Sequence, residues 1–242
     1  MKKVLVLVLA AIMLLACTAC GGSDFEKSLF FDADFSKGTF NDQANDVSRS
    51  AAGEITFEND AEVGKTVAVF KEACVTYLID TTKVSQGDYT MEAYVNVKKQ
   101  GGFGLICGTY FYNSKTGAAF GAGKFDLGEG DSAGVNKVLS MFEGNGYATT
   151  SVGGGDYNTW VHLVYVHEGE SSYYYVNGKL AENGKIKAQQ LVPYDSNAGF
   201  RIGAYNGLCQ FPVTEFKAAF VRLYSAPASE AEVTALYEAR NS

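Results

Sequence analysis

Histidine, tryptophan and proline are scarce in this sequence of 242 residues, which contains two, one and three of them, respectively. With so few histidines, a zinc site or a Ser-His-Asp triad would have to use His162 or His167. These residues are five positions apart, so on one strand they point to opposite faces and cannot share a metal ion. Neither adjoins a nucleophile-elbow motif, so hydrolase chemistry of the triad type is not indicated.

Cysteine and positive charge are also in short supply. Beyond the first twenty residues only Cys74, Cys107 and Cys209 remain. Their number is odd and their spacing fits neither a metal site nor a disulfide framework, so we expect all three to pack as small apolar residues. The net charge is −7, and it becomes −9 without Lys2 and Lys3. This balance argues against nucleic acid and anionic lipid as partners.

The N-terminus has the pattern of a secretion signal. Lys2 and Lys3 precede an uncharged apolar run, residues 4–16, that is too short to span a bilayer but suits a signal peptide. The following segment resembles a bacterial lipobox with two registers, because Cys17 has the better aliphatic context and Cys20 the better small-residue context. We favour lipidation of Cys17. The expected organisation is a signal peptide and lipobox in residues 1–20, a tether in 21–27 and one domain in 28–242, anchored to the extracytoplasmic face of a bacterial membrane.

The domain itself is rich in short β-type runs separated by Gly, Asn and Asp. In residues 89–97, Met91, Ala93, Val95 and Val97 alternate with polar neighbours, which is the period of a half-buried antiparallel strand. The expected strands are Leu29–Phe35, Ile55–Phe57, Val67–Phe70, Val75–Ile79, Tyr89–Val97, Gly104–Tyr112, Ala118–Phe125, Lys137–Phe142, Tyr147–Ser151, Trp160–His167, Ser172–Val176, Phe200–Ala204 and Glu215–Tyr224.

Two local signals sharpen this pattern. Asn177-Gly178 stands between apolar runs, and both residues tolerate the positive φ that a two-residue type I′ hairpin requires. Ser229 and Glu232 form a capping box ahead of an apolar helical repeat, which predicts a short C-terminal helix. Many strands and one terminal helix favour a β-sandwich.

Three segments carry a family resemblance. Residues 160–166 (WVHLVYV), 174–180 (YYVNGKL) and 200–224, from the FRIGA run to FKAAFVRLY, follow one another in the order seen in laminin-G-like domains. The chain therefore resembles the concanavalin A-like lectin/glucanase superfamily, with Ala218 standing where a glycine is commoner. The resemblance implies an all-β fold, an antiparallel two-sheet jelly-roll β-sandwich with one short C-terminal helix. It also implies a structural hydrogen bond for His162, but no particular ligand.

A glucanase-type site is the one enzymatic alternative. Glu58, Asp60 and Glu62 alternate as the nucleophile, modulating carboxylate and acid do on a strand of laminarinase-type enzymes of this superfamily. In this sequence, however, the positions between them are Asn and Ala, and the motif runs into a Gly. Since Asn-Asp near Gly is turn chemistry, we interpret this segment as a solvated acidic turn.

Two non-catalytic sites are expected in loops. Asp42, Asn45 and Asp46 are oxygen ligands of the kind that calcium prefers, although Asx-rich loops also cap their own backbone. Calcium is the only cofactor indicated. A sugar site needs aromatic faces and amide groups on a loop rim, and the candidate residues are Tyr110, Tyr112, Asn113, Tyr147, Tyr157, Tyr205 and Asn206. Packing on half-exposed strands is the alternative role for these tyrosines.

These features give three functional hypotheses. The preferred one is a membrane-anchored module that recognises a polysaccharide or cell-wall glycan without catalysis. The second is a module for adhesion to an envelope protein, which would use the same sandwich faces. The third is a glycoside hydrolase that uses the Glu58 motif.

Overall fold

The computed structural model describes residues 23–41, 43, 49–80, 82–85, 87–99, 102–109, 116–123, 139–145, 149–188, 199–204, 209–210 and 212–241. The strands in these ranges are β1 (Leu29–Asp34), β2 (Arg49–Asp60), β3 (Lys65–Tyr77), β4 (Tyr89–Val97), β5 (Gly104–Gly108), β6 (Thr116–Ala122), β7 (Leu139–Asn145), β8 (Thr149–Gly153), β9 (Trp160–Glu168), β10 (Ser171–Val176), β11 (Lys179–Lys187), β12 (Phe200–Ile202) and β13 (Glu215–Tyr224). The helices are η1 (Glu26–Ser28), η2 (Phe35–Lys37), α2 (Thr82–Ser85) and α3 (Glu230–Ala239).

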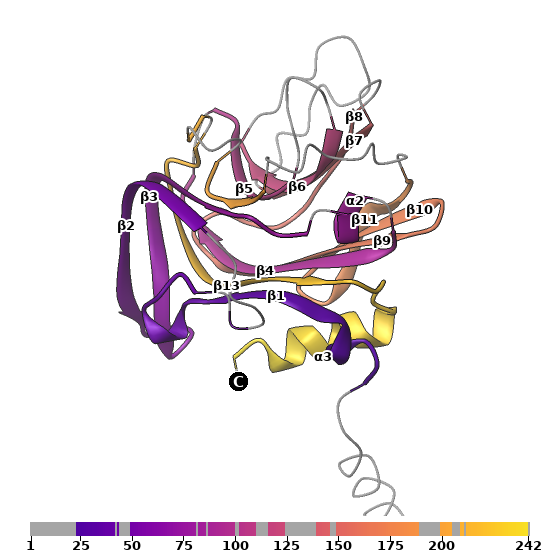
Figure 1. Cartoon of the computed structure of the whole chain (residues 1–242), viewed down its shortest axis with the longest axis horizontal. Coiled ribbons are helices and arrows are strands. Elements are labelled where there is room, and N and C mark those ends of the chain that lie inside the picture. Colours follow the sequence, from indigo (N-terminus) through magenta and orange to yellow (C-terminus); the bar gives the residue numbers. More distant parts are fainter. Residues whose placement is uncertain are drawn as a thin grey trace, which may run out of the picture.

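All strand pairs described are antiparallel, and they form one sheet that curls into two layers (Figure 1). The order along the sheet is β11-β10-β9-β4-β13-β3-β12-β5-β6-β7-β8, while β1 pairs with β13 and β2 with β3. Strand β3 connects the layers, because residues 68–71 pair with β13 in the lower layer and residues 75–77 pair with β12 in the upper layer. The fold is therefore the expected jelly-roll sandwich with a C-terminal helix.

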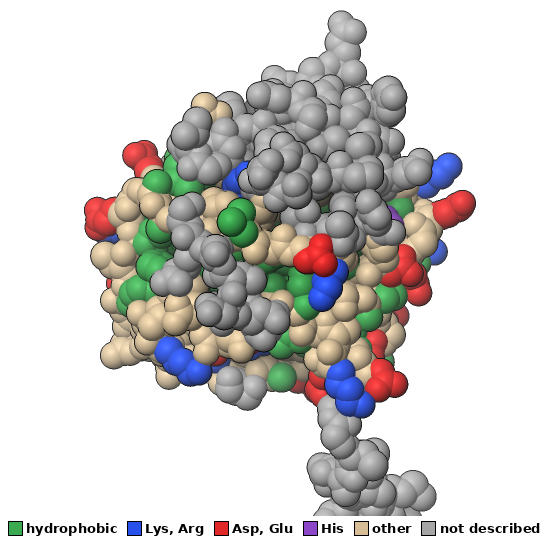
Figure 2. Space-filling view, viewed as in Figure 1, with side chains coloured by type: hydrophobic (Ala, Val, Ile, Leu, Met, Phe, Trp, Pro, Cys, Tyr) green, Lys and Arg blue, Asp and Glu red, His purple; other side chains and the backbone are tan. Residues whose placement is uncertain are grey.

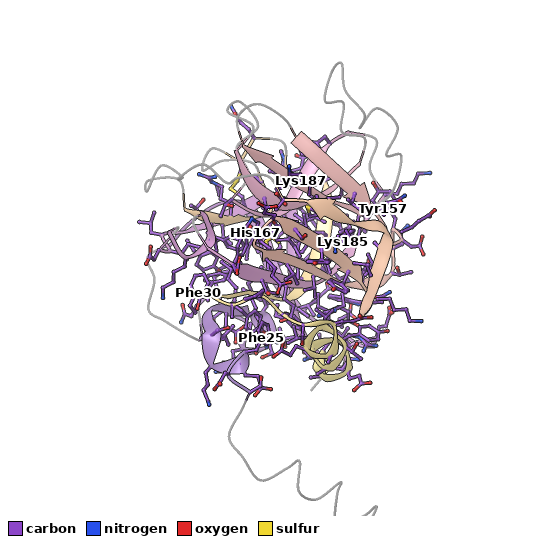
Figure 3. All side chains as sticks on the ribbon, turned by 90° about the vertical axis from the view of Figure 1, so that its right-hand side faces the viewer. Phe25, Phe30, Tyr157, His167, Lys185 and Lys187 are labelled. Atoms are coloured by element: carbon purple, nitrogen blue, oxygen red, sulfur yellow. A yellow bond between two sulfur atoms is a disulfide. The ribbon has the colours of Figure 1, made fainter. Side chains whose placement is uncertain are left out.

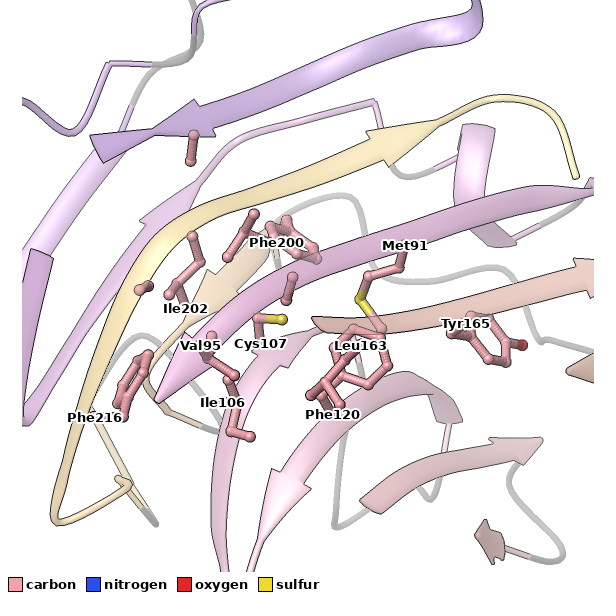
Figure 4. Packing of buried hydrophobic residues seen from close by; sticks show 14 of the residues in the cluster. Met91, Val95, Ile106, Cys107, Phe120, Leu163, Tyr165, Phe200, Ile202 and Phe216 are labelled. Carbon is pink, nitrogen blue, oxygen red and sulfur yellow. The ribbon is translucent and has the colours of Figure 1, made fainter. Parts of the chain in front are cut away.

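The main core fills the space between the two layers. Met91 and Leu163 from the lower layer and Ile106, Phe120 and Ile202 from the upper layer are all buried there (Figure 4). Burying a side chain of this size contributes roughly 1.5–3 kcal/mol. The alternating runs of the sequence thus face inward as expected.

Helix α3 covers the outer face of the lower layer. Val233 packs there with Tyr175 and with Phe25, whose ring stacks on Tyr224 at 4.5 Å between centroids. The capping box is present, since the Ser229 hydroxyl accepts from the Glu232 amide and the Glu232 carboxylate accepts from the Ser229 amide. Among the described residues, no helix is long and apolar enough to cross a membrane.

The predicted hairpin is also present, with φ of 51° at Asn177 and 74° at Gly178. Several strand predictions need correction. The runs predicted at 67–70 and 75–79 belong to the single strand β3, which ends at Tyr77, and the strand predicted at 55–57 extends over 49–60. Residues 179–187, which were not predicted as a strand, form β11.

The prediction that Cys74 and Cys209 pack as free apolar residues is wrong, because they form a disulfide across 135 residues of sequence. It ties β3 to the segment that follows β12. Only Cys107 behaves as expected: it is buried and reduced, and burial raises the pKa of its thiol.

Candidate functional site

The acidic motif at Glu58 is built into the fold as an ion-pair cluster. Lys217 Nζ lies 2.7 Å from Glu58 Oε1 and 2.8 Å from Asp60 Oδ2. Asp60 is buried, and its Oδ1 accepts from the indole of Trp160 at 3.3 Å and from the amides of Glu62 and Val63. The solvated turn expected at this position is therefore wrong for Asp60, which ends β2 and ties the β2–β3 hairpin to β9 and β13.

The charge state of Asp60 follows from these contacts. Burial raises the pKa of its carboxyl, but the hydrogen bonds from Lys217 and from the two turn amides outweigh burial and leave the pKa below its ordinary value. Asp60 is consequently held as an anion for structural reasons.

His162 has the structural hydrogen bond that the sequence indicated. It is fully buried on the outer face of the lower layer, and its Nε2 lies 2.8 Å from Oε1 of Glu92. The other oxygen of Glu92 accepts from the Tyr224 hydroxyl at 2.8 Å, and Arg222 lies beyond it, paired with Asp32 at 2.9 Å. This network lies between the sheet and α3 and is part of the fold.

A second buried carboxylate lies between the layers. Glu143 follows Leu139 and Met141 on the inward face of β7 and accepts from the Tyr165 hydroxyl of β9 at 2.8 Å. The Tyr165 hydroxyl also lies 3.3 Å from Ser172. The sequence carried a signal for this group, because the alternation that buries Leu139 and Met141 also buries Glu143.

The expected calcium ligands Asp42, Asn45 and Asp46 lie outside the described residues. Within the described ranges, no group of three or more His, Cys, Asp or Glu side chains could hold a metal ion.

Most of the aromatic set expected to bind sugar also lies outside the described residues, namely Tyr110, Tyr112, Asn113, Tyr147, Tyr205 and Asn206. Tyr157 is described. It packs against the core beside β9, and its hydroxyl is hydrogen-bonded to the backbone of Gly123, while burial raises its pKa. These contacts favour a packing role for Tyr157.

The described strand ends divide this aromatic set between the two ends of the upper layer. Residue 110 comes two positions after the end of β5, and residue 147 lies between β7 and β8, which pair at Gly144 and Thr149. Tyr157 is at the opposite end, where Gly104 of β5 pairs with Ala122. A groove that included both ends would have to run the length of β5.

The outer face of the upper layer has an unusual composition. Cross-strand pairing places Thr76, Arg201, Gly108 and Ala119 in one row, which continues to Phe142 of β7. The residues before and after Thr76, Arg201 and Ala119 belong to the interlayer core, so the side chains of these three point outward. Arg201 is the only charged residue of the row, and it is 4% exposed.

Strands β5 and β6, next to Arg201, carry small residues that are here called the small-residue floor: Gly108, which pairs with Arg201, and Gly117, Ala119 and Gly121 of β6. A side chain on Gly108 would place its Cβ 2.4 Å from the Ala118 carbonyl oxygen, and its φ is +147°. Only glycine therefore fits beside Arg201. Glycines inside strands often mark places where another backbone comes close, and at Gly108 that backbone is β6. An arginine beside it carries N–H donors. This site could not be predicted from the sequence because it depends on which strands pair.

On the face drawn in Figure 2, the described basic and acidic side chains are scattered among one another and do not gather in one patch of either sign.

Comparison with known proteins places the chain among sandwich-type binding and glucanase folds. A laminin G family model, described as concanavalin A-like lectin/glucanases superfamily, matches residues 75–234. Comparison with curated protein sequences found no match.

Several solved structures share the fold at low sequence identity. Domain 4 of AbnA, an extracellular GH43 arabinanase from Geobacillus stearothermophilus, in complex with arabinotriose, is 14% identical with a TM-score of 0.66; the alignment covers 86% of this chain and 98% of that domain. The botulinum neurotoxin serotype D binding domain is 10% identical with a TM-score of 0.67, covering 89% of this chain and 53% of that one. The neurotoxin DC binding domain in complex with rat synaptotagmin II is 11% identical with a TM-score of 0.62, covering 88% and 52%.

Proposed function

Since this chain belongs to the concanavalin A-like lectin/glucanase superfamily, we propose that it is a binding module that recognises carbohydrate without cleaving it. The observation that carries the proposal is the small-residue floor around Arg201. Small side chains at these positions would let a sugar ring lie close to the sheet, and the buried Arg201 guanidinium would donate hydrogen bonds to its hydroxyls. The arabinanase domain that shares the fold is described with a bound arabinotriose.

The contacts of the acidic motif support a module that does not cleave its ligand. Glu58 and Asp60 share Lys217, and Asp60 also holds Trp160 and the turn amides. Two carboxylates that work on a glycosidic bond must instead face the substrate from either side. The motif is better explained as a clamp, meaning the set of contacts from Asp60 to Trp160 and Lys217 that fixes the β2–β3 hairpin to β9 and β13.

The loop residues expected from the sequence extend this proposal. Tyr110, Tyr112, Asn113 and Tyr147 belong to connections at one end of the strands that carry the floor, and Tyr205 and Asn206 follow β12. We propose that they supply aromatic faces and amide groups along the rim, with Tyr157 at the opposite end. Asp42, Asn45 and Asp46 stay candidates for a structural calcium ion.

The proposed location is the extracytoplasmic face of a bacterial membrane, with lipid on Cys17 or, in the alternative register, Cys20. The disulfide Cys74–Cys209 supports it, because such bonds persist mainly in oxidising compartments. Both the short helix η1 and α3 lie on the lower side in Figure 1, so an N-terminal anchor would leave the upper layer directed away from the membrane.

The test is a glycan array probed with the mature chain, in calcium and in EDTA, followed by titration of the best ligand. Arg201→Gln should weaken binding about tenfold or more, which corresponds to about 1.4 kcal/mol. Arg222→Gln, which removes a guanidinium from the opposite face of the molecule, is the control; because Arg222 pairs with Asp32 in the buried network, circular dichroism first checks that both variants are folded. No binding to any glycan, or equal weakening by both variants, would contradict the proposal.

A protein partner is the second candidate, favoured by one relative of the same fold whose structure was determined with synaptotagmin. Retention of an envelope protein that is insensitive to competing glycans would support it. Binding that a glycan competes away would favour the carbohydrate proposal.

A further inference from the structure

Strand β11 concentrates positive charge on an acidic protein. Its nine residues include Lys179, Lys185 and Lys187, all exposed, whereas the whole chain has a net charge of −7. Several lysines elsewhere are paired with carboxylates, as Lys27 is with Asp24. In contrast, Lys185 and Lys187 make no ion pair with any residue in the described part of the chain. Their charge is therefore available to an external group.

These two lysines share a face with an aromatic pair. Lys185 lies opposite Tyr173 of β10, and Lys187 lies opposite Ser171. The Lys185 ammonium is 5.3 Å from the centre of the Tyr173 ring, and that ring stacks on Tyr175 with 6.5 Å between centroids. Lys185 and Lys187 are on the side of the molecule that faces the reader in Figure 3.

The arrangement has a direction. Tyr175 is nearly buried under α3, and burial together with the nearby charges of Glu230 and Glu168 raises the pKa of its hydroxyl. The Tyr175 end of the face is thus apolar, while the other end carries Lys185 and Lys187 together with Glu168, which pairs with Ser171. An anionic group would be drawn to the two lysines and an uncharged ring to Tyr173, which is only partly buried.

Edge protection alone does not explain this face. Strand β11 ends the sheet order, and lysines commonly keep edge strands from pairing with other chains. Edge protection requires charged side chains on β11, but it does not require an aromatic ring on the neighbouring strand. A lysine beside a half-exposed tyrosine with a neighbouring hydroxyl offers, in addition, a charge, a sugar-stacking surface and a hydrogen bond in one place.

We propose that Ser171, Tyr173, Lys185 and Lys187, the β10–β11 face, bind an acidic polysaccharide. The two ammonium groups are two residues apart on one strand, or about 6.6 Å, and would each bind a carboxylate of a uronic-acid chain. Tyr173 would pack against the C–H face of a sugar ring. This face is separate from the small-residue floor, so the absence of binding at one site would not imply its absence at the other.

The test uses affinity electrophoresis of the mature chain through polygalacturonate and through a neutral galactan. The K185Q/K187Q double variant should bind polygalacturonate about tenfold more weakly, with unchanged binding to any neutral glycan from the array. The control is K27Q/K71Q, which changes the net charge by the same amount at two exposed lysines paired with Asp24 and Glu54. This control should bind as the wild type does.

A second variant keeps the charges. Tyr173→Leu retains packing against α3 but removes the ring, so it should weaken polygalacturonate binding while leaving both lysines in place. Three results would overturn the proposal: no retardation of the wild type by polygalacturonate, equal weakening in the two double variants, or equal retardation by DNA. If K185Q/K187Q aggregates and Tyr173→Leu binds polygalacturonate as well as the wild type does, the role of the lysines is edge protection instead.

Discussion

Replacing Asp60 by alanine should destabilise the protein without touching any catalytic step. In the native chain this carboxylate accepts from Lys217 at 2.8 Å, from the Trp160 indole at 3.3 Å and from the amide of Glu62 at 3.0 Å. Alanine would leave the buried indole and the turn amides without an acceptor. Lys217 would keep its contact with Glu58 at 2.7 Å.

The magnitude follows from the groups left unsatisfied. A buried donor without an acceptor costs about 1–3 kcal/mol. Trp160 is 8% exposed and contributes in full, whereas the Glu62 amide and Lys217 are nearer to water and contribute less. We therefore expect Asp60→Ala to lower the free energy of unfolding by about 3 kcal/mol at pH 7.

The pH dependence has a definite sign. The folded-state pKa of Asp60 is below its ordinary value despite burial, because Lys217 and the turn amides favour the anion. Its stabilising contribution is therefore present above the unfolded pKa of about 3.9 and is lost as the pH falls through the lower folded value. The difference in stability between wild type and Asp60→Ala should be constant from pH 7 to about 5 and shrink in stronger acid.

Urea unfolding followed by Trp160 fluorescence measures this difference directly. Glu62→Gln is the control, since this exposed neighbour accepts no hydrogen bond in the described ranges and should change stability by less than about 0.5 kcal/mol. A loss below about 1 kcal/mol for Asp60→Ala, or a loss that grows in acid, would refute the clamp interpretation.

Three further predictions concern stability. Reduction of Cys74–Cys209, or Cys74→Ser, should lower the free energy of unfolding by about 2–5 kcal/mol because it releases a loop of 135 residues, and a thermal scan with and without reductant would show no shift if the bond were absent. Ser229→Ala should cost about 1 kcal/mol by removing the cap of α3, which urea unfolding can measure; a neutral result would argue against the cap. Gly178→Ala should cost more than about 1 kcal/mol, because φ is +74° and a Cβ would lie 2.9 Å from that of Tyr237; an unchanged melting temperature would contradict this contact.

Local sequence determined the parts of the fold that local contacts stabilise. The Asn177-Gly178 turn and the box of Ser229 and Glu232 each need only residues within a few positions, so their residue types predict their geometry. The period of β4 identified the side that faces the core, but the half-buried strand expected there is wrong, because Thr90, Glu92 and Tyr94 on the other side are buried as well.

Features made by distant residues could not be predicted in the same way. Asp60 is a residue type that is common in turns, yet here it ends a strand. The reason is its contacts with Trp160, 100 positions away, and with Lys217, 157 positions away. The disulfide joins residues whose neighbourhood exists only after β3 and the segment behind β12 come together. Likewise, Arg201 can be assigned outward from its apolar neighbours, but its position beside Gly108 depends on the pairing of β12 with β5.

The central claim is that the small-residue floor around Arg201 binds sugar and leaves it intact. Saturation-transfer NMR of the mature chain with the best oligosaccharide from the array follows binding and cleavage in the same tube over a day. We expect saturation transfer from the protein to the sugar protons, and we expect this transfer to be lost in Arg201→Gln and retained in Arg222→Gln. No new reducing ends should appear. Transfer that survives Arg201→Gln, or the appearance of cleaved product, would contradict the claim.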